Sequence, residues 1–211
     1  NRARTAGQIM TRLRATKAHE LRYQICISGA ARGASIETGK ELCMAAAREI
    51  VRRGHIVTTG ATRGLPYYGA LAAKVAGGTN ITSIGFSPAA SRLAHVKKYR
   101  LPLDAFDTIL FTGFEYTGRN LLLVRSCDAV VMVGGRIGTL NELTIAIEER
   151  KPIGVLLGSG GMTEEVEDVL KAAKRSRAGL IFDHDPASLV ERLIQLIEVR
   201  SRRLPDLTVE L

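Results

Sequence analysis

The chain alternates short apolar runs with longer segments of helical period. Runs at residues 24–28 (QICIS), 55–59 and 129–133 (AVVMV) have the length of buried strands,. Segments such as 35–53 and 139–149 carry the apolar spacing of helices,. This alternation is typical of βαβ units, whose helices cover both faces of a parallel sheet. The sequence therefore predicts a Rossmann-like, doubly wound α/β fold with a mainly parallel sheet of about seven strands.

The rest of the chain keeps this rhythm except for residues 87–106, where Pro88 and Pro102 interrupt it and a loop or lid with a short helix is expected. We expect one Rossmann-like nucleotide-binding domain over 23–200, a basic extension or helix at 1–22 and a tail at 201–211. The remaining predicted strands lie at 80–85, 108–112, 153–157 and 179–182, and the remaining helices at about 65–76, 117–126, 163–174 and 186–200.

The formal net charge of +9 is concentrated near the start of the sequence, where residues 1–22 hold six Lys or Arg residues and only one acidic residue, Glu20. A basic arm of this kind can bind nucleic acid or an acidic partner, although a solvated helix or a fraying tail is the simpler interpretation. Aromatic residues make up only 5% of the chain. Because single-stranded nucleic acid is bound on exposed aromatic rings, we do not expect nucleic acid as a partner.

The three cysteines predict buried thiols in a reducing compartment, because Cys26, Cys43 and Cys127 lie in apolar segments without C-x-x-C spacing,. The four histidines show no metal-ligand spacing, so no metal site is predicted. No apolar run approaches the roughly 18 residues of a membrane span, and the first residues lack the apolar core of a secretory signal. We therefore expect a cytoplasmic protein with no membrane partner.

Four glycine-rich loops, at residues 29–33, 60–64, 134–138 and 158–161, follow predicted strands. In open parallel sheets, ligands bind beyond the carboxyl ends of the strands. Glycine lets the backbone approach a phosphate closely, and a helix N-terminus then offers free N–H groups. The pattern predicts a nucleotide phosphate site. The motifs of P-loop NTPases and of dinucleotide-binding dehydrogenases are both absent from the sequence,.

Two charged residues near these loops are candidates for catalysis. Glu142 stands three residues after Thr139, which is the spacing of a capping box and is sufficient to explain it,. A carboxylate one turn inside a phosphate-binding helix could also orient a water or stabilise a cationic sugar. Arg119 follows Gly118 at the start of a predicted helix, where the dipole disfavours cations. An anion near Arg119 would explain this position, and so would exposure to solvent. The positions alone leave these alternatives open.

The stretch 118–142 resembles the Lonely Guy (LOG) family, often labelled "lysine decarboxylase-like", whose hallmark is an Arg followed by P-G-G-x-G-T-x-x-E. Aligned without gaps, the resemblance places the family's catalytic arginine at Arg119 and its catalytic glutamate at Glu142. This sequence departs from the motif at two positions, with Gly134 in place of the proline and Arg136 in place of the second glycine.

The resemblance implies hydrolysis of the N-glycosidic bond of a nucleoside 5′-monophosphate, AMP or cytokinin-type, to free base and ribose 5-phosphate. It also implies a homodimer or higher homo-oligomer and requires neither cofactor nor metal. The implied catalytic residues are Glu142 and Arg119. The implied substrate- and phosphate-binding residues are Ser28, Gly29, Gly60, Gly64, Gly134, Gly135, Arg136, Gly138 and Thr139.

Two other functions compete with this one. Molybdenum cofactor carrier proteins of the same superfamily share the G-G-x-x-G-T spacing and hold a pterin–phosphate ligand without turnover. A carrier does not need both Arg119 and Glu142, so the presence of both favours the enzyme. Some distant Rossmann-like relatives bind single-stranded DNA, which would give the basic arm a role, but the scarcity of aromatic residues argues against this.

Overall fold

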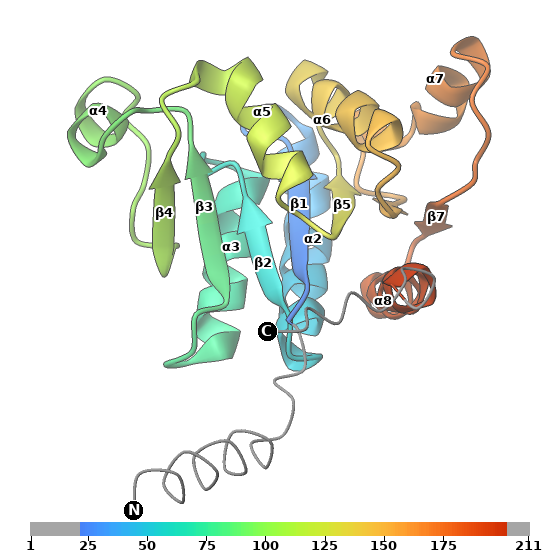
Figure 1. The fold of residues 1–211 in the computed structure, drawn as a ribbon, viewed down its shortest axis with the longest axis horizontal. Helices are drawn as coiled ribbons and strands as arrows, with labels where there is room; N and C mark the ends of the chain where they lie inside the picture. The colour runs from blue at the N-terminus through green and yellow to red at the C-terminus, as the bar shows by residue number, and fades with distance from the viewer. Residues whose placement is uncertain (1–21, 202–211) are drawn as a thin grey trace, which may run out of the picture.

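A computed structural model describes residues 22–201 (Figure 1). The predicted basic extension and C-terminal tail therefore lie outside the described residues, apart from residues 22 and 201. The elements in chain order are β1 (Gln24–Gly29), α2 (Ser35–Arg52), β2 (Ile56–Thr59), α3 (Leu65–Gly77), β3 (Ser83–Ser87), α4 (Arg92–Lys97), β4 (Thr108–Phe111), α5 (Glu115–Arg125), β5 (Ala129–Val133), α6 (Ile137–Glu148), β6 (Ile153–Leu156), the 3-10 helix η1 (Gly161–Thr163), α7 (Val166–Ala172), β7 (Leu180–Asp183) and α8 (Pro186–Ser201).

All seven strands form one sheet in the order β4-β3-β2-β1-β5-β6-β7, and every neighbouring pair is parallel. Ile25 of β1 stands opposite Val57 of β2 on one side and Ala129 of β5 on the other. The strand order reverses between β1 and β5, which makes their carboxyl ends the topological switch point of the sheet. The predicted Rossmann-like fold with about seven strands is confirmed.

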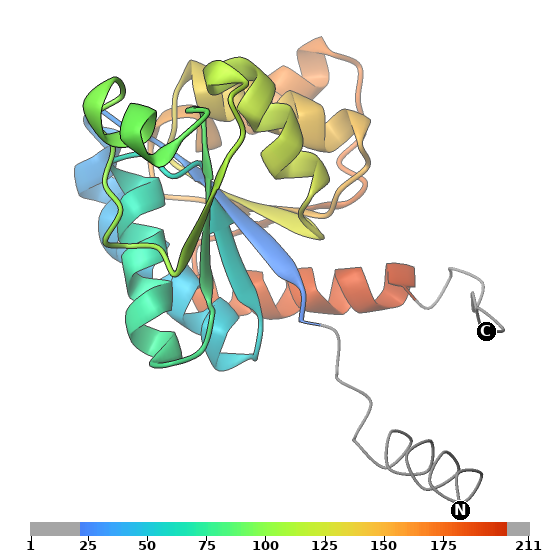
Figure 2. The same ribbon diagram turned by 60° about the vertical axis from the view of Figure 1, so that its left-hand side comes forward.

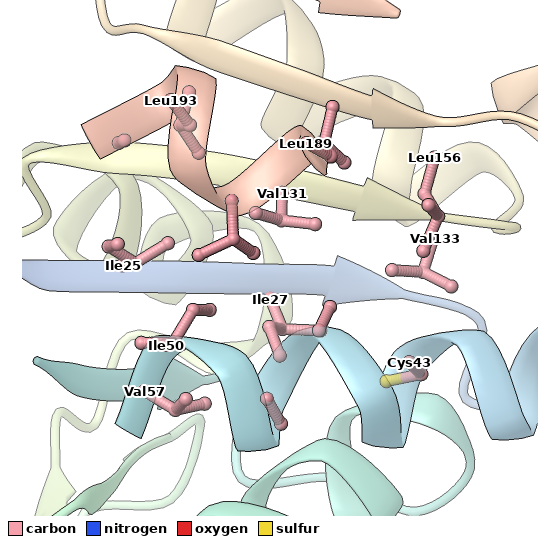
Figure 3. Packing of buried hydrophobic residues seen from close by; sticks show 14 of the residues in the cluster. Ile25, Ile27, Cys43, Ile50, Val57, Val131, Val133, Leu156, Leu189 and Leu193 are labelled. Carbon is pink, nitrogen blue, oxygen red and sulfur yellow. The ribbon is translucent and has the colours of Figure 1, made fainter. Parts of the chain in front are cut away.

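Helices cover both faces of the sheet because residues of the central strands alternate between two apolar layers. Ile25 and Ile27 of β1 belong to the layer with α2, α3 and α8, whereas Cys26 belongs to the layer with α5, α6 and α7. Figures 1 and 2 show these two helical layers on opposite sides of the sheet. Figure 3 shows the first layer, where Leu189 of α8 packs over the sheet. The predicted burial of all three cysteines is confirmed.

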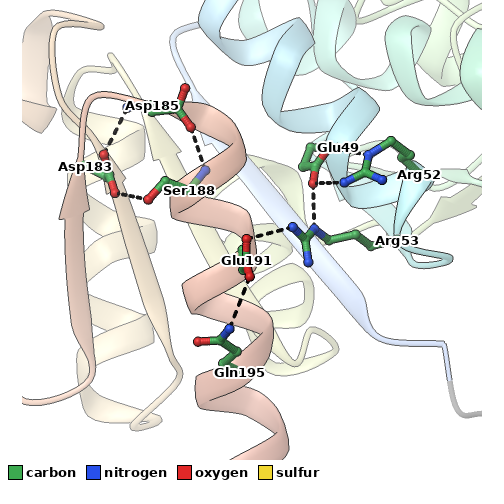
Figure 4. Close-up of polar contacts among 8 residues, drawn as sticks. All are labelled: Glu49, Arg52, Arg53, Asp183, Asp185, Ser188, Glu191 and Gln195. Atoms are coloured by element: carbon green, nitrogen blue, oxygen red, sulfur yellow. Dashed lines mark hydrogen bonds and ion pairs between the residues drawn. The ribbon is translucent and has the colours of Figure 1, made fainter.

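Polar contacts fix the start of α8 and tie this helix to α2 (Figure 4). The Asp185 carboxylate accepts a bond from the Ser188 N–H at 2.6 Å, so it caps the start of the helix,. Arg53 at the end of α2 reaches both Glu49, at 2.6 Å, and Glu191 of α8, at 3.0 Å. Hydrogen bonds from Arg52 and Arg53 lower the pKa of Glu49 to about 2.

The irregular segment 87–106 contains the expected short helix, α4, and is anchored to the fold by a buried histidine. His95 lies 2.8 Å from the Ser87 hydroxyl and 2.9 Å from the Pro102 carbonyl through its two ring nitrogens. The Ser91 hydroxyl accepts a bond from the backbone of α4 and begins the helix. These two contacts tie α4 to the end of β3 and to the segment that follows the helix. No helix in residues 22–201 has the length and apolar character needed to cross a membrane.

Candidate functional site

A pocket of about 650 Å³ lies at the switch point, beyond the carboxyl ends of β1, β2 and β5. This volume is in the usual range for small-molecule sites. The walls come from the loops after β1 and β2, the segment before β4, helix α5 and the first turn of α6. The lining residues are Ile27, Gly29, Ala30, Ala31, Arg32, Gly60, Thr62, Arg63, Pro66, Tyr99, Arg100, Leu101, Tyr116, Arg119, Asn120, Arg136, Ile137, Gly138, Thr139 and Glu142.

A buried ion pair forms part of the pocket wall. Arg119 Nη1 lies 3.6 Å from Glu142 Oε1, and the two residues are only 5% and 7% exposed. The Ser28 hydroxyl, at the end of β1, donates to the other carboxylate oxygen of Glu142. The side-chain amide of Asn120, also on α5, lies 2.9 Å from Glu142 Oε1. The carboxylate is thus held by three elements, β1, α5 and α6.

Arg119 does not lie at the start of its helix as predicted. Helix α5 begins at Glu115, so Arg119 is in its second turn, and its side chain is buried instead of solvated. The guanidinium packs directly on the backbone at the end of β2, where a Cβ on Gly60 would stand 1.7 Å from Arg119 Nη1. Gly60 is therefore required to leave room for the arginine.

Burial shifts the pKa values of both members of the pair. Desolvation raises the pKa of Glu142, and this effect exceeds the opposing influence of Arg119 and of the Ser28 hydrogen bond. Desolvation likewise lowers the pKa of Arg119. Arg119 Nε is buried and has no hydrogen-bond partner among the described residues. Such a dry, charged pair at a pocket wall can act strongly on charge that develops on a bound ligand.

The N-terminus of α6 opens into the same pocket. The helix begins at Ile137 after Arg136, with no side-chain cap and no acidic residue in its first turn. Thr139 lies inside the helix, so the capping-box interpretation of Thr139 and Glu142, one of the two left open by the sequence, is wrong. The Glu142 carboxylate contacts Ser28 and Arg119 instead. Because the first N–H groups of a helix lack intrahelical partners, this end suits an anion.

The glycine loop at 158–161 supports the loop after β5 and does not line the pocket. The Ser159 hydroxyl accepts a bond from the Gly134 N–H at 2.8 Å, and the Met162 N–H donates to the Gly135 carbonyl at 3.1 Å. Gly134 and Gly135 adopt φ values of 58° and 108°, which turn the chain from β5 into α6. A Cβ on Gly161 would stand 2.4 Å from the Gly135 carbonyl oxygen. The close packing of these two loops thus fixes where α6 begins.

Most of the residues implied by the resemblance come together in this structure. Those lining the pocket are Gly29, Gly60, Arg119, Arg136, Gly138, Thr139 and Glu142. Ser28 does not line the pocket but donates a hydrogen bond to Glu142. Gly64, Gly134 and Gly135 are outside the lining and shape the loops. A Cβ on Gly64, for example, would stand 2.3 Å from the Ala30 carbonyl oxygen.

Sequence reasoning missed three arginines and two tyrosines of the pocket wall. Arg32 and Arg63 stand inside the predicted glycine loops after β1 and β2. Their positions in these loops could have identified them as pocket residues. Tyr99 and Arg100 belong to the irregular segment, which hydrogen bonds of His95, Arg63 and Glu115 hold beside the pocket.

The two tyrosines, Tyr99 and Tyr116, form an apolar corner of the pocket. Their rings meet edge to face with centroids 5.8 Å apart. The Tyr99 hydroxyl donates to Glu115, which also pairs with Lys98 at 3.2 Å, and the bond to Glu115 raises the pKa of Tyr99. Tyr99 is thereby held in place as a neutral ring beside Tyr116. Across residues 22–201, no group of three or more His, Cys, Asp or Glu side chains is placed to hold a metal ion.

Comparison with known proteins finds relatives in sequence and in fold. An uncharacterized protein of Archaeoglobus fulgidus is 30% identical over 107 residues, which cover 51% of this chain and 63% of that protein, a little under two thirds of its length. The molybdenum cofactor carrier protein of Chlamydomonas reinhardtii is 24% identical, with a TM-score of 0.66 over 84% of this chain and 99% of its own. DNA processing protein A of Helicobacter pylori is 18% identical, with a TM-score of 0.57 over 85% and 84%. At these identities the two solved structures show a shared fold.

The family model of the SLOG cluster4 family matches residues 22–190, a span that runs from before β1 into α8 and includes every residue that lines the pocket. The match confirms the relation to the LOG family that residues 118–142 predicted, because the SLOG cluster is LOG-like. This chain, with its buried Arg119–Glu142 pair at the switch point of a parallel sheet, belongs to the SLOG cluster4 family.

Proposed function

We propose that the protein hydrolyses the N-glycosidic bond of a nucleoside 5′-monophosphate, AMP or cytokinin-type, to a free base and ribose 5-phosphate. The observation that carries this proposal is the buried Arg119–Glu142 pair, which shares one pocket with the uncapped N-terminus of α6. A carboxylate held beside an anion site matches a substrate that has a phosphate at one end and becomes cationic at C1′ during reaction.

The pocket offers a place for each part of such a substrate. The 5′-phosphate would bind at the first turn of α6, where the free N–H groups of Gly138 and Thr139 and the side chain of Arg136 favour an anion,. The base would lie against the rings of Tyr99 and Tyr116, which line the same pocket,. This arrangement brings the ribose toward Glu142.

The proposed reaction depends on the positive charge that develops on C1′. As the C1′–N bond breaks, its electron pair leaves with the base and C1′ becomes an oxocarbenium-like cation. The Glu142 carboxylate stabilises this cation and orients a water molecule toward C1′. The water oxygen bonds to C1′, and the departing base nitrogen takes up the proton that the water loses. Arg119 positions the carboxylate through the ion pair and favours its ionised form, against the desolvation that raises the pKa of Glu142.

The decisive test is release of base from AMP and related nucleoside monophosphates, followed by chromatography, for the wild type and Glu142→Gln. We expect at least about a 100-fold loss of turnover in the variant, since general-base and electrostatic contributions have this size. Glu148→Gln, which removes an exposed carboxylate from the same helix, is the matched control and should keep wild-type turnover. Undiminished base release by Glu142→Gln would rule out this mechanism.

Binding without turnover is the second candidate, and the fold shared with a molybdenum cofactor carrier protein favours it. A carrier would hold a pterin–phosphate ligand in the pocket, with its phosphate at the same end of α6. Arg119→Ala separates the two functions, because it should abolish hydrolysis but leave most of a carrier's affinity for ligand. A wild-type protein that releases no base from any nucleotide, yet binds a pterin phosphate, would establish the carrier function.

We also propose that the protein forms a homo-oligomer. Exposed apolar side chains on β4 and α5 and in the turn between them, namely Leu110, Phe114, Leu121 and Leu122, offer a surface for self-association,. Sedimentation velocity on the full chain would measure the oligomeric state directly.

A further inference from the structure

The pocket carries more positive charge than a single phosphate can balance. Five arginines line it, namely Arg32, Arg63, Arg100, Arg119 and Arg136, and Glu142 is the only carboxylate among the lining residues. Arg119 is paired with Glu142. The other four arginines are exposed, and within residues 22–201 no ion pair joins any of them to an acidic side chain.

A phosphoryl monoester carries a charge of about −1.5 to −2 at neutral pH. The helix N-terminus of α6 and Arg136 are sufficient for one such group, with Arg32 nearby on the loop after β1. Two arginines, Arg63 and Arg100, then remain without an ion-pair partner among residues 22–201. Like charges held together in a partly enclosed site repel, and a second anionic group on the ligand would relieve that repulsion.

Arg63 and Arg100 form a fixed structure of their own. Arg63 Nε and Nη2 both donate to the Arg100 carbonyl oxygen, at 3.1 Å and 2.6 Å, which fixes the plane of the Arg63 guanidinium. Arg100 adopts a left-handed backbone with φ of 54°, which is unusual for a residue with a side chain,. Both residues also line a neighbouring hollow of about 350 Å³ with Asp104, whose carboxylate accepts a bond from the Tyr67 hydroxyl at 2.8 Å.

We propose that Arg63 and Arg100 form a second phosphoryl subsite, so that the preferred ligand is a nucleotide with two phosphoryl groups, such as a nucleoside diphosphate. This inference rests on the proposed function for the identity of the pocket, but it concerns binding and not turnover. The first phosphoryl group lies at the start of α6, and the second lies at the wall that the pocket shares with the neighbouring hollow.

The test is a comparison of AMP and ADP affinity by titration calorimetry. Affinities are measured in the Glu142→Gln protein to prevent hydrolysis, with competition binding in the wild type as a check. We expect ADP to bind about tenfold tighter than AMP, as one additional set of charge-assisted hydrogen bonds implies. Adding Arg63→Gln and Arg100→Gln should bring the ratio of the two affinities to about one, because ADP affinity falls further than AMP affinity.

A control substitution removes one positive charge away from the pocket, as each of the two pocket substitutions does within it. Arg48→Gln, on the exposed face of α2, lowers the net charge by one without touching a lining residue and should keep the ADP preference. Equal affinity for AMP and ADP, or an ADP preference that survives both pocket substitutions, would overturn the second subsite. A clear ADP preference, together with a wild-type protein that releases no base from any nucleotide, would instead refute the proposed hydrolysis and leave the subsite standing.

Discussion

Replacing Gly60 with alanine should inactivate the protein by displacing Arg119. The new Cβ would stand 1.7 Å from Arg119 Nη1, whereas ordinary contact begins at 3.4 Å, so the guanidinium must retreat by about 1.7 Å. Arg119 is only 5% exposed, and that movement breaks its 3.6 Å contact with Glu142. Because a misplacement of about 1 Å at a reacting centre can cost 100-fold, we expect base release to fall by at least about 100-fold.

The same substitution should also lower stability. Breaking a buried ion pair costs up to roughly 3–5 kcal/mol, and partial relaxation of a flexible side chain reduces this to about 1–3 kcal/mol. For a chain of this size the loss corresponds to roughly 2–4 °C in Tm for each kcal/mol. Thermal unfolding followed by circular dichroism would measure the stability, and chromatography of the released base would measure the activity.

A second glycine separates the local effect from a general loss of stability. Gly54 has φ of 88°, and a Cβ added there would meet no other atom within 4 Å, so Gly54→Ala strains the backbone far from the pocket. It should lower Tm and keep wild-type turnover. Gly60→Ala activity within about threefold of wild type would refute the argument that this glycine positions Arg119. In an Arg119→Ala background, adding Gly60→Ala should cost less stability than it does in the wild type.

Two further predictions concern protonation. Ser28→Ala removes a hydrogen bond that lowers the pKa of Glu142. The acidic limb of the pH–activity profile should therefore move to higher pH. If this limb does not move, Glu142 does not control the activity at acidic pH. Glu49→Gln should lower the free energy of unfolding by about 1 kcal/mol at neutral pH. This value is smaller than the pKa shift of Glu49 alone implies, because Arg52 is exposed and solvent screens the ion pair,. The Glu49 pKa is lowered from 4.5 to about 2, so its carboxylate stabilises the fold above pH 4.5 and this contribution is lost as the pH falls toward 2,. Urea denaturation at several pH values would measure this effect. The free energies of unfolding of the variant and the wild type should approach each other below pH 4.5.

The sheet and its glycine loops were predictable because their signals are local. Buried central strands such as β5 read as continuous apolar runs, and turns into helices require glycine at positive φ,. The role of Gly60 was not predictable, because it depends on a guanidinium that arrives from α5, two strands further along the chain. The spacing of Thr139 and Glu142 was misleading, since the helix begins two residues earlier than the pattern suggests.

The arginines of the pocket were likewise predictable only in part from the sequence. Arg32 and Arg63 belong to loops whose position was predicted, but nothing local indicates that Arg100 joins them from the segment before β4. That segment has no strong hydrophobic periodicity. Its position depends on tertiary contacts such as those of His95, whose two ring nitrogens hydrogen-bond with Ser87 and Pro102. Contacts of this kind are decided by tertiary packing, which a single sequence does not encode in any short pattern.

The central place of β1 has a consequence for how the chain folds during synthesis. β1 pairs with β2 early, but its second neighbour, β5, stands about 100 residues later, as the register of Ile25 with Ala129 shows. At ribosomal speeds of about 5–20 residues per second, one edge of β1 stays open for roughly 5–20 s. During that interval the apolar strand exposes unpaired backbone groups, a template for aggregation. Newly made chains are therefore expected to depend on chaperones until β5 emerges, and pausing between residues 60 and 129 should lower the yield of folded protein.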